Sequence, residues 1–340
     1  MIKKGTIKFL PLLAIIIFGC VKSRPLDIKN IGSLSETPQN FPKMVYPLDN
    51  QHTIQRWELG KKLFFDPHLS IDSSVSCASC HLPQNSFANL KATTPGAFNR
   101  PGTRNSPSLA NIGYHPYYTR EGGVPSLEMQ ILVPIQEHNE FAFNIIDLQE
   151  RLQKSEQYNK MSQKAYQRNI DYFSIVRAIA TFERSLTSGN SAFDKYNNGN
   201  KKALSISEQN GLSLFYSAKT NCSSCHTGIN FTNYNFENNG LYDVYPDNGR
   251  ERFTKKSTDA GKFKIASLRN VGITAPYMHD GSLESLDAVI EHYNSGGKDH
   301  SNKSSLIKPL NLSVDEKANL KAFLLSLTDY HFINNPNFKP

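Results

Sequence analysis

Four of the five cysteines in the chain form two copies of the pattern Cys-x-x-Cys-His. The first copy consists of Cys77, Cys80 and His81, and the second of Cys222, Cys225 and His226. Two thiols at this spacing can add to the two vinyl groups of haem, while the adjacent histidine becomes an iron ligand. A zinc knuckle needs four ligands, and a thioredoxin-like thiol pair needs no following histidine. The pattern therefore favours two covalent haem c groups, with His81 and His226 as proximal iron ligands.

The first residues are typical of a bacterial export leader. MIKK is followed by the apolar run FLPLLAIIIF and then by Gly19-Cys20, and the run is too short for a comfortable transmembrane helix. A cysteine at this place resembles the lipidated cysteine of a lipobox, although Phe18 is an imperfect match. We expect a signal peptide over 1–20, lipid on Cys20, a tether over 21–45 and a periplasmic, membrane-anchored protein. An ordinary secretory leader is the alternative.

Length and composition set broad limits. A chain of 340 residues has room for about two domains of roughly 100 to 200 residues each. Apolar residues make up 38% and charged residues 20%, as in ordinary globular proteins. The formal net charge is +8, but the lysines and arginines are scattered without a long run, so we expect no nucleic-acid partner.

The body of the chain contains one internal repeat. GKKLFFDPHLSIDSSVSCASCH begins at Gly60 and GLSLFYSAKTNCSSCH at Gly211, and in each a phenylalanine follows the glycine by four residues. Gly60 and Phe64, like Gly211 and Phe215, would therefore share one face of a helix. A bare stretch of backbone beside an aromatic ring predicts a close crossing with another helix.

Each half ends in a further amphipathic segment, predicted as a helix over residues 170–186 and 314–327. Ser205–Glu208 and Ser313–Glu316 have the Ser-x-x-Glu pattern of a capping box, so a helix begins at each.

The segment before Ser205 is rich in Gly, Asn, Ser and Lys, which places a domain boundary near residue 200. We predict a mainly α fold of two cytochrome c-like domains, 46–200 and 201–340. Each domain would carry one haem c, and the two would pack across a shared interface.

Several motifs, in this order and over roughly residues 55 to 330, resemble the bacterial di-haem cytochrome c peroxidase family, including its MauG branch. The motifs are SCASCH, TRNSPSLAN, SLEMQILVPIQEHNEF, LRNVGITAPYMHDGSL and HYNSGG. The resemblance implies reduction of hydrogen peroxide to water. The N-terminal haem would react with peroxide, and the C-terminal haem would pass on electrons from a small periplasmic cytochrome c or cupredoxin.

Cleavage of peroxide needs a general acid-base group, for which a carboxylate in a partly apolar pocket is suited. Glu140 lies where the family carries its catalytic glutamate, ten residues after Gln130 and six after Pro134. The resemblance implies that Gln130 and Pro134 shape the same pocket, although ordinary packing is an alternative for both. A solvated charge at a helix end, like Glu137, is the alternative for Glu140.

Two positions depart from reductively activated members of the family. Their distal histidine follows the proximal one by sixteen residues, and the matching position here is Ala97. The first iron is therefore expected to be open even when both haems are oxidised. Their interhaem tryptophan is missing from the matching stretch 119–123, so electrons would use Tyr117, Tyr118 or direct tunnelling. The single tryptophan, Trp57, is predicted to be a packing residue.

At the second haem, the family's sixth ligand matches Tyr293, fourteen residues after His279. Tyrosinate lowers the potential of an iron centre and methionine raises it. Met278 is the alternative ligand, and a merely packed tyrosine is the third reading. The resemblance also implies that His279 hydrogen-bonds a haem propionate.

The remaining site predictions concern charges and a metal. Arg104 and Arg269 could pair with propionates, since guanidinium matches carboxylate geometry, or form surface ion pairs. The resemblance implies a calcium ion bound by the positions Asn105, Thr274 and Pro276, and oxygen ligands suit calcium.

The predicted function is peroxide reduction. A MauG-like oxidase that acts on a protein or quinone precursor is the second reading, and a di-haem electron carrier without catalysis is the third. A homodimer is expected only because such relatives often form one.

Overall fold

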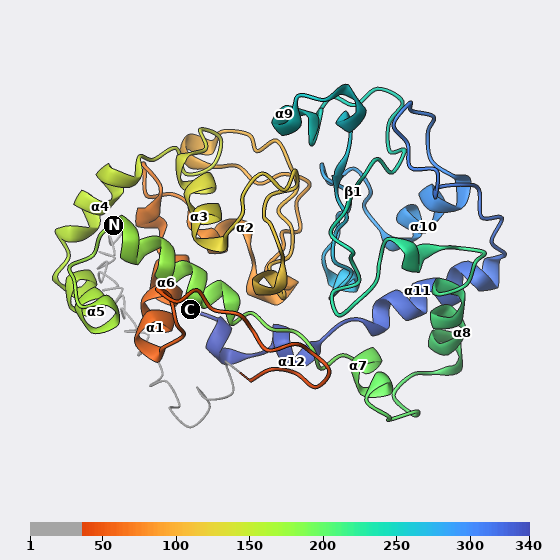
Figure 1. Ribbon diagram of the computed structural model, residues 1–340, viewed down its shortest axis with the longest axis horizontal. Helices are drawn as coiled ribbons and strands as arrows, with labels where there is room; N and C mark the ends of the chain where they lie inside the picture. Colours follow the sequence, from red (N-terminus) through yellow and green to blue (C-terminus); the bar gives the residue numbers. More distant parts are fainter. Residues whose placement is uncertain (1–35) are drawn as a thin grey trace, which may run out of the picture.

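The computed structural model describes residues 36–340 of the chain and confirms a mainly helical fold (Figure 1). The predicted leader, Cys20 and the first part of the predicted tether lie outside the described residues. Among residues 36–340, no helix is long and apolar enough to cross a membrane. The helices are α1 (Ile54–Phe64), α2 (Cys77–Cys80), α3 (Leu127–Gln136), α4 (Ile145–Gln153), α5 (Glu156–Tyr166), α6 (Tyr172–Arg184), α7 (Ala192–Asn197), α8 (Ile206–Phe215), α9 (Glu251–Thr254), α10 (Leu286–Ser295), α11 (Val314–Ser326) and α12 (Tyr330–Ile333). Strands β1 (Phe236–Glu237) and β2 (Phe263–Lys264) form one antiparallel pair.

The predicted close helix crossings are confirmed in both halves. A Cβ atom at Gly60 would overlap with the carbonyl oxygen of Ala178, so α1 crosses α6 with the two backbones in contact. A Cβ at Gly211 would overlap in the same way with the carbonyl oxygen of Asn319, where α8 crosses α11. The repeat in the sequence therefore corresponds to the same close helix crossing at a glycine in each half.

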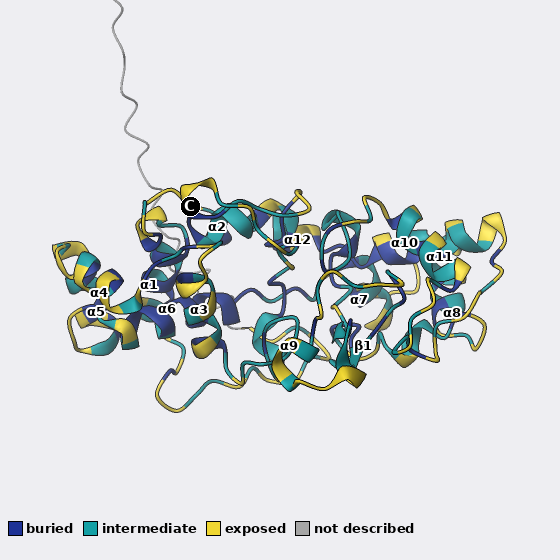
Figure 2. Cartoon of the chain, turned by 90° about the horizontal axis from the view of Figure 1, so that it is seen from above, coloured by how far each residue is buried: buried dark blue, intermediate teal, exposed yellow. Residues whose placement is uncertain are grey.

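The predicted capping boxes also form. Ser205 accepts a hydrogen bond from the amide of Glu208 and starts α8, and Ser313 does the same with Glu316 at the start of α11. Helix α6 begins at Tyr172, two residues after the start predicted from the apolar pattern, because Asp171 caps it. Figure 2 shows α6 as a buried helix, while α4 and α5 lie at the exposed outer end of the molecule.

The structure has two large hydrophobic cores, one mainly from each half of the chain, and a small third cluster. Phe193 of α7 packs on Phe231 and Phe323 of the second core, with ring centroids 5.1 and 5.8 Å apart. The chain end crosses back the other way, since Phe332 and Phe338 join the first core. Figure 1 shows α12 and the C-terminus beside the N-terminal half. Helix α7 thus packs on the second core although it precedes residue 200, and α12 packs on the first core.

Residues 36–45, predicted as tether, pack against the folded body. Phe41 lies edge-on to Tyr114 at 5.8 Å, and the guanidinium of Arg269 lies 5.1 Å from the Phe41 ring centroid. Tyr114 comes before α3 and Arg269 comes after β2, so this segment contacts both halves of the chain. Within this segment Pro38, Phe41 and Met44 are part-buried, while most of the other residues remain exposed.

Candidate active site

The first haem-attachment motif is preorganised for iron ligation. Helix α2 carries Cys77 and Cys80, and the amide of His81 donates to the carbonyl oxygen of Cys77 at 2.8 Å. The Nδ1 atom of His81 lies 2.7 Å from the carbonyl oxygen of Phe87 and 3.1 Å from that of Pro107. Such a bond fixes the ring and leaves Nε2 for a metal. Burial lowers the pKa of His81, which favours the neutral ring that a ligand must have.

The second motif repeats this arrangement. Cys222 begins a short turn, and the amide of His226 donates to its carbonyl oxygen at 2.9 Å. The Nδ1 atom of His226 lies 2.9 Å from the carbonyl oxygen of Phe231. The four motif cysteines are free of disulfides, so all four thiols are available. Both sets of residues thus fit a covalent haem c, with His81 and His226 each offering Nε2.

A pocket opens beside the first motif. Helix α3 supplies one wall, α6 supplies a second, and the chain after α3 brings Glu140 to the rim. The structure therefore brings together the predicted residues Gln130, Pro134 and Glu140 with the attachment motif. The lining residues are Leu69, Cys77, Cys80, His81, Leu109, Gln130, Ile131, Pro134, Ile135, Glu140, Phe141, Ile179 and Glu183.

Glu140 has the electrostatic character of a proton carrier. Glu140 is an exposed residue as a whole, and the part of its carboxyl group that faces the pocket is desolvated by the surrounding protein atoms. This desolvation, together with the negative charge of Glu137, raises the pKa of Glu140 to about 7. A carboxyl group with such a pKa can both accept and release a proton near neutrality.

The loop at Ala97 lies directly on the chain that carries Glu140. The amide of Ala97 donates to the carbonyl oxygen of Glu140, and a Cβ at Gly96 would overlap with the carbonyl oxygen of Asn139. Position 97 is fully buried and carries only a methyl group. No side chain that could ligate iron therefore extends from this position.

Glu183 is a pocket residue that the sequence analysis did not single out. It lies on α6 one turn after Ile179, and both line the pocket. A glutamate on the apolar face of the predicted helix 170–186, at helical spacing from Ile179, was the signal that could have revealed it.

The second site contains both candidates for a sixth ligand. The side-chain amide nitrogen of Asn239 lies 3.2 Å from the sulfur of Met278, and the same side chain hydrogen-bonds Tyr293. Tyr293 is near Cys222 and Cys225, whose charges would act on its hydroxyl, and burial raises its pKa to about 12. Tyr293 and Met278 thus lie around one amide group, and the geometry leaves both readings open.

His279 is a buried ring with a spare polar atom. It stacks on Phe263 with centroids 4.0 Å apart, and its Nε2 atom has no hydrogen-bond partner among residues 36–340. Burial lowers the pKa of His279. An unsatisfied buried nitrogen of this kind fits the predicted contact with a haem propionate.

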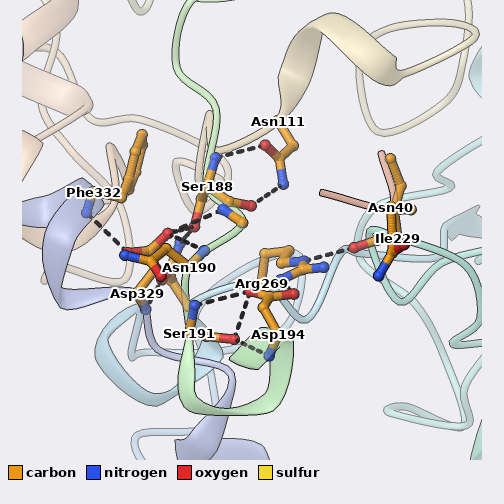
Figure 3. A network of polar contacts seen from close by, with 12 residues as sticks. Asn40, Asn111, Ser188, Asn190, Ser191, Asp194, Ile229, Arg269, Asp329 and Phe332 are labelled. Atoms are coloured by element: carbon orange, nitrogen blue, oxygen red, sulfur yellow. Dashed lines mark hydrogen bonds and ion pairs between the residues drawn. The ribbon is translucent and has the colours of Figure 1, made fainter. Parts of the chain in front are cut away.

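The two predicted propionate arginines have carboxylate partners within the chain. Arg104 binds Asp247 through two nitrogens, at 2.6 and 2.9 Å, and Glu121 at 2.5 Å. Arg269, which is 3% exposed, binds both carboxylate oxygens of Asp194 at 2.7 Å (Figure 3). The Arg269–Asp194 pair is buried and the Arg104 pairs are part-buried, so neither arginine forms a fully exposed surface pair.

The positions expected for a calcium ion and for electron transfer lie around the junction of the two halves. The amide of Asn105 donates to the carbonyl oxygen of His279 at 2.9 Å, which brings it close to the chain that contains Thr274 and Pro276. Tyr117 donates to the carbonyl oxygen of Tyr234 and so crosses between the halves.

Two further aromatic residues are buried: Tyr118, which is a candidate for the interhaem electron route, and Trp57, which is predicted to be a packing residue. Tyr118 is buried in a small cluster with Leu127 and Ala180. Trp57 is buried in the first core and donates to the hydroxyl of Ser185 at 2.8 Å, which confirms its packing role.

A helical chain with one haem-attachment motif in each half has the architecture of a di-haem c-type cytochrome. The family model described as di-haem cytochrome c peroxidase matches residues 54–202. The methylamine utilization protein MauG of Methylorubrum extorquens is 34% identical over 305 residues, which are 88% of this chain and 85% of that protein. The chain belongs to the di-haem cytochrome c peroxidase family, as its motifs predicted.

Two further relatives show the breadth of this family. Cytochrome c551 peroxidase of Pseudomonas aeruginosa is 34% identical over 301 residues, covering 85% of this chain and 83% of that protein. The crystal structure of a MauG-like protein associated with microbial copper homeostasis superposes with a TM-score of 0.85. It is 31% identical and covers 89% of this chain and 98% of that one. The chain is accordingly an oxidoreductase, and its family implies two haem c groups.

Proposed function

We propose that the protein reduces hydrogen peroxide to water at the pocket beside His81. The observation that carries this proposal is that Glu140, with a pKa of about 7, lines the same pocket as Cys77, Cys80 and His81. Haem bound at this motif would supply the redox chemistry that breaks the O–O bond. The chain must supply the proton transfer.

The roles of the side chains follow from this geometry. The Glu140 carboxylate accepts a proton from the peroxide oxygen that will stay behind and returns it to the oxygen that leaves as water. Gln130 and Pro134, one turn apart on α3, form the wall against which peroxide is oriented. Ala97 leaves the pocket without a competing ligand from its loop.

Electrons would come from a small periplasmic protein, a cytochrome c or a cupredoxin, through the haem at His226. The leader and Cys20 support a lipid-anchored periplasmic location, where such donors occur. Asn105, with the carbonyl oxygens of Thr274 and Pro276, is the site we propose for calcium. The guanidinium of Arg120 donates to the main-chain oxygen of Asn105 at 2.6 Å, so a calcium ion bound there would lie near a positive charge.

The test is peroxide turnover by the full di-haem protein and by Glu140→Gln. We expect the variant to keep both haems and to lose roughly 10²- to 10⁴-fold in turnover, the usual range for a positioned acid-base group. Glu150→Gln, on the exposed face of α4, is the matched control and should leave turnover unchanged. Full activity of Glu140→Gln would exclude the assigned role.

A MauG-like oxidase is the second candidate, favoured by Tyr293 beside the second motif and by the relatives reported above. It would use oxidising equivalents on a protein or quinone precursor. Mixing the oxidised protein with peroxide in the absence of a donor separates the two functions. A peroxidase turns over only with a reduced donor, whereas an oxidase of this kind holds its oxidising equivalents until a substrate arrives.

A further inference from the structure

We propose that Glu183 is a second acid of the peroxide pocket and supplies protons that the reaction consumes. This inference rests on the proposed peroxidase function and adds a residue to it. Glu183 lies on α6, on the wall of the pocket that also contains Glu140 and Cys77. The pocket therefore has two carboxyl groups, and they come from different elements.

The burial of Glu183 is the first argument. Its residue is 4% exposed, and its Oε2 atom has no hydrogen-bond partner among the described residues. An unpartnered carboxyl in a protein interior costs free energy, and the ionised form costs far more than the neutral one. The buried Oε2 atom of Glu183 does not stabilise the fold, and we infer that it is there to contact a ligand in the pocket.

The charges around Glu183 do not neutralise it. Its chain neighbour Arg184 is the cation that acts on the pKa of Glu183, but that guanidinium binds both carboxylate oxygens of Glu128 on α3, at 2.5 and 2.8 Å. The other titratable groups that are coupled to the charge of Glu183 are Tyr118 and Cys77, and neither is a cation. Burial raises the pKa of Glu183 to about 8, with Arg184 opposing and Glu128 assisting the rise. Glu183 therefore carries a proton at neutral pH.

The stoichiometry of peroxide reduction gives this proton a use. One hydrogen peroxide, two electrons and two protons give two molecules of water. Glu140 moves a proton from one oxygen of peroxide to the other, which adds no proton to the total. The two protons that accompany the two electrons from the donor must enter the pocket from elsewhere. A neutral carboxylic acid on the pocket wall can release the first of these protons and be reprotonated before the second is needed.

The experiment compares the wild-type di-haem protein with Glu183→Gln, Glu183→Asp and the exposed control Glu150→Gln. The first measurement is the infrared spectrum of the oxidised protein without peroxide, at pH values below and above 8. We expect a carbonyl band of a neutral carboxylic acid that persists after Glu140 has ionised above about pH 7 and disappears as the pH passes about 8. This band should be missing from Glu183→Gln, which should retain only the band that titrates with Glu140. This readout is independent of activity.

The second measurement is steady-state peroxide reduction in H2O and in D2O. Glu183→Gln should turn over at least tenfold more slowly and change the solvent isotope effect, because proton entry becomes limiting. Glu183→Asp should recover part of the rate. Unchanged turnover and isotope effect in Glu183→Gln, or no neutral-acid band in the wild type, would overturn the inference.

The outcomes also separate this inference from the function on which it rests. A wild type that reduces no peroxide refutes the proposed function. A wild type that is active beside an equally active Glu183→Gln refutes only the role of Glu183. If Glu183→Gln does not fold, the wild-type band and the Glu183→Asp rate still decide the question.

Discussion

The backbone amide of Ala97 donates a hydrogen bond to the carbonyl oxygen of Glu140, with an N···O distance of 2.7 Å. The loop that would carry a distal histidine in reductively activated relatives is thereby fastened to the chain that carries the pocket acid. Because position 97 is alanine, this loop offers no side chain that could ligate iron. We therefore expect the first iron of the oxidised protein to be open to peroxide.

Ala97→His is the direct test of that relationship. An imidazole at this position should occupy the sixth coordination site, so the oxidised protein should show a low-spin spectrum and react with peroxide only after one-electron reduction. Stopped-flow absorption of the fully oxidised protein measures both effects. Ala97→Leu, of comparable bulk but unable to ligate, is the control. Rapid reaction of oxidised Ala97→His would show that the loop does not reach the iron.

The two pocket acids predict a bell-shaped dependence of turnover on pH. Glu140 must be ionised to accept a proton, so the rate should fall as the pH decreases through about 7. Glu183 must be protonated to supply one, so the rate should fall again as the pH rises through about 8. Glu140→Gln should remove the acidic limb and Glu183→Gln the basic limb. A profile whose limbs are unaffected by both substitutions would contradict these assignments.

Local patterns in the sequence predicted the fold well, and long-range packing did not follow from them. The spacing of Gly60 and Phe64, one helical turn apart, predicted a helix crossing. The same spacing could not identify the partner residue, Ala178. The place of Phe332 in the first core depends on the path of the whole chain. Likewise, Glu183 looked like one charge on a helix until α6 was packed against the pocket.

The helix crossing in the second half can be tested by Gly211→Ala. A methyl group there meets the carbonyl oxygen of Asn319, a backbone atom that cannot rotate away, so α8 and α11 must separate. Overpacking of this kind costs about 1–3 kcal/mol. Urea unfolding of the purified protein gives the loss of stability. Ser213→Ala, at an exposed position of α8, should be close to neutral, and a Gly211→Ala protein as stable as wild type would refute the contact.

We expect Asn239 to influence which of the two candidate ligands binds the second haem, because its side chain contacts both Met278 and Tyr293. Leu241 and Tyr245 donate to its side-chain oxygen, each at 3.2 Å, so its nitrogen must point at Met278 and Tyr293. Asn239→Leu removes a bond that lowers the pKa of Tyr293 and frees the sulfur of Met278. We expect a shift toward methionine ligation and a higher reduction potential.

The control for this prediction is Met278→Leu. If Tyr293 is the ligand in the wild type, Met278→Leu should leave the ferric spectrum and the potential unchanged, and adding it to Asn239→Leu should abolish the shift. A change of spectrum in Met278→Leu alone would instead identify Met278 as the wild-type ligand.

Substitution of Arg269, which pairs with Asp194, can distinguish a role of the arginine in stabilising the fold from a role in binding a haem propionate. Asp194 lies on α7, Arg269 precedes the 3-10 turn after β2, and Figure 3 shows the pair within a network that continues to Asp329 beside α12. Arg269→Met leaves the Asp194 carboxylate buried and without its partner, which costs about 3–5 kcal/mol. Lys321→Met breaks the exposed pair with Asp287 and should cost about 0–1 kcal/mol.

Urea unfolding measures the loss of stability in both variants, and the reduction potential of the second haem is measured in the same proteins. A large loss of stability with an unchanged potential establishes Arg269 as a fold residue; a shifted potential with little loss of stability would show that the guanidinium belongs to a propionate.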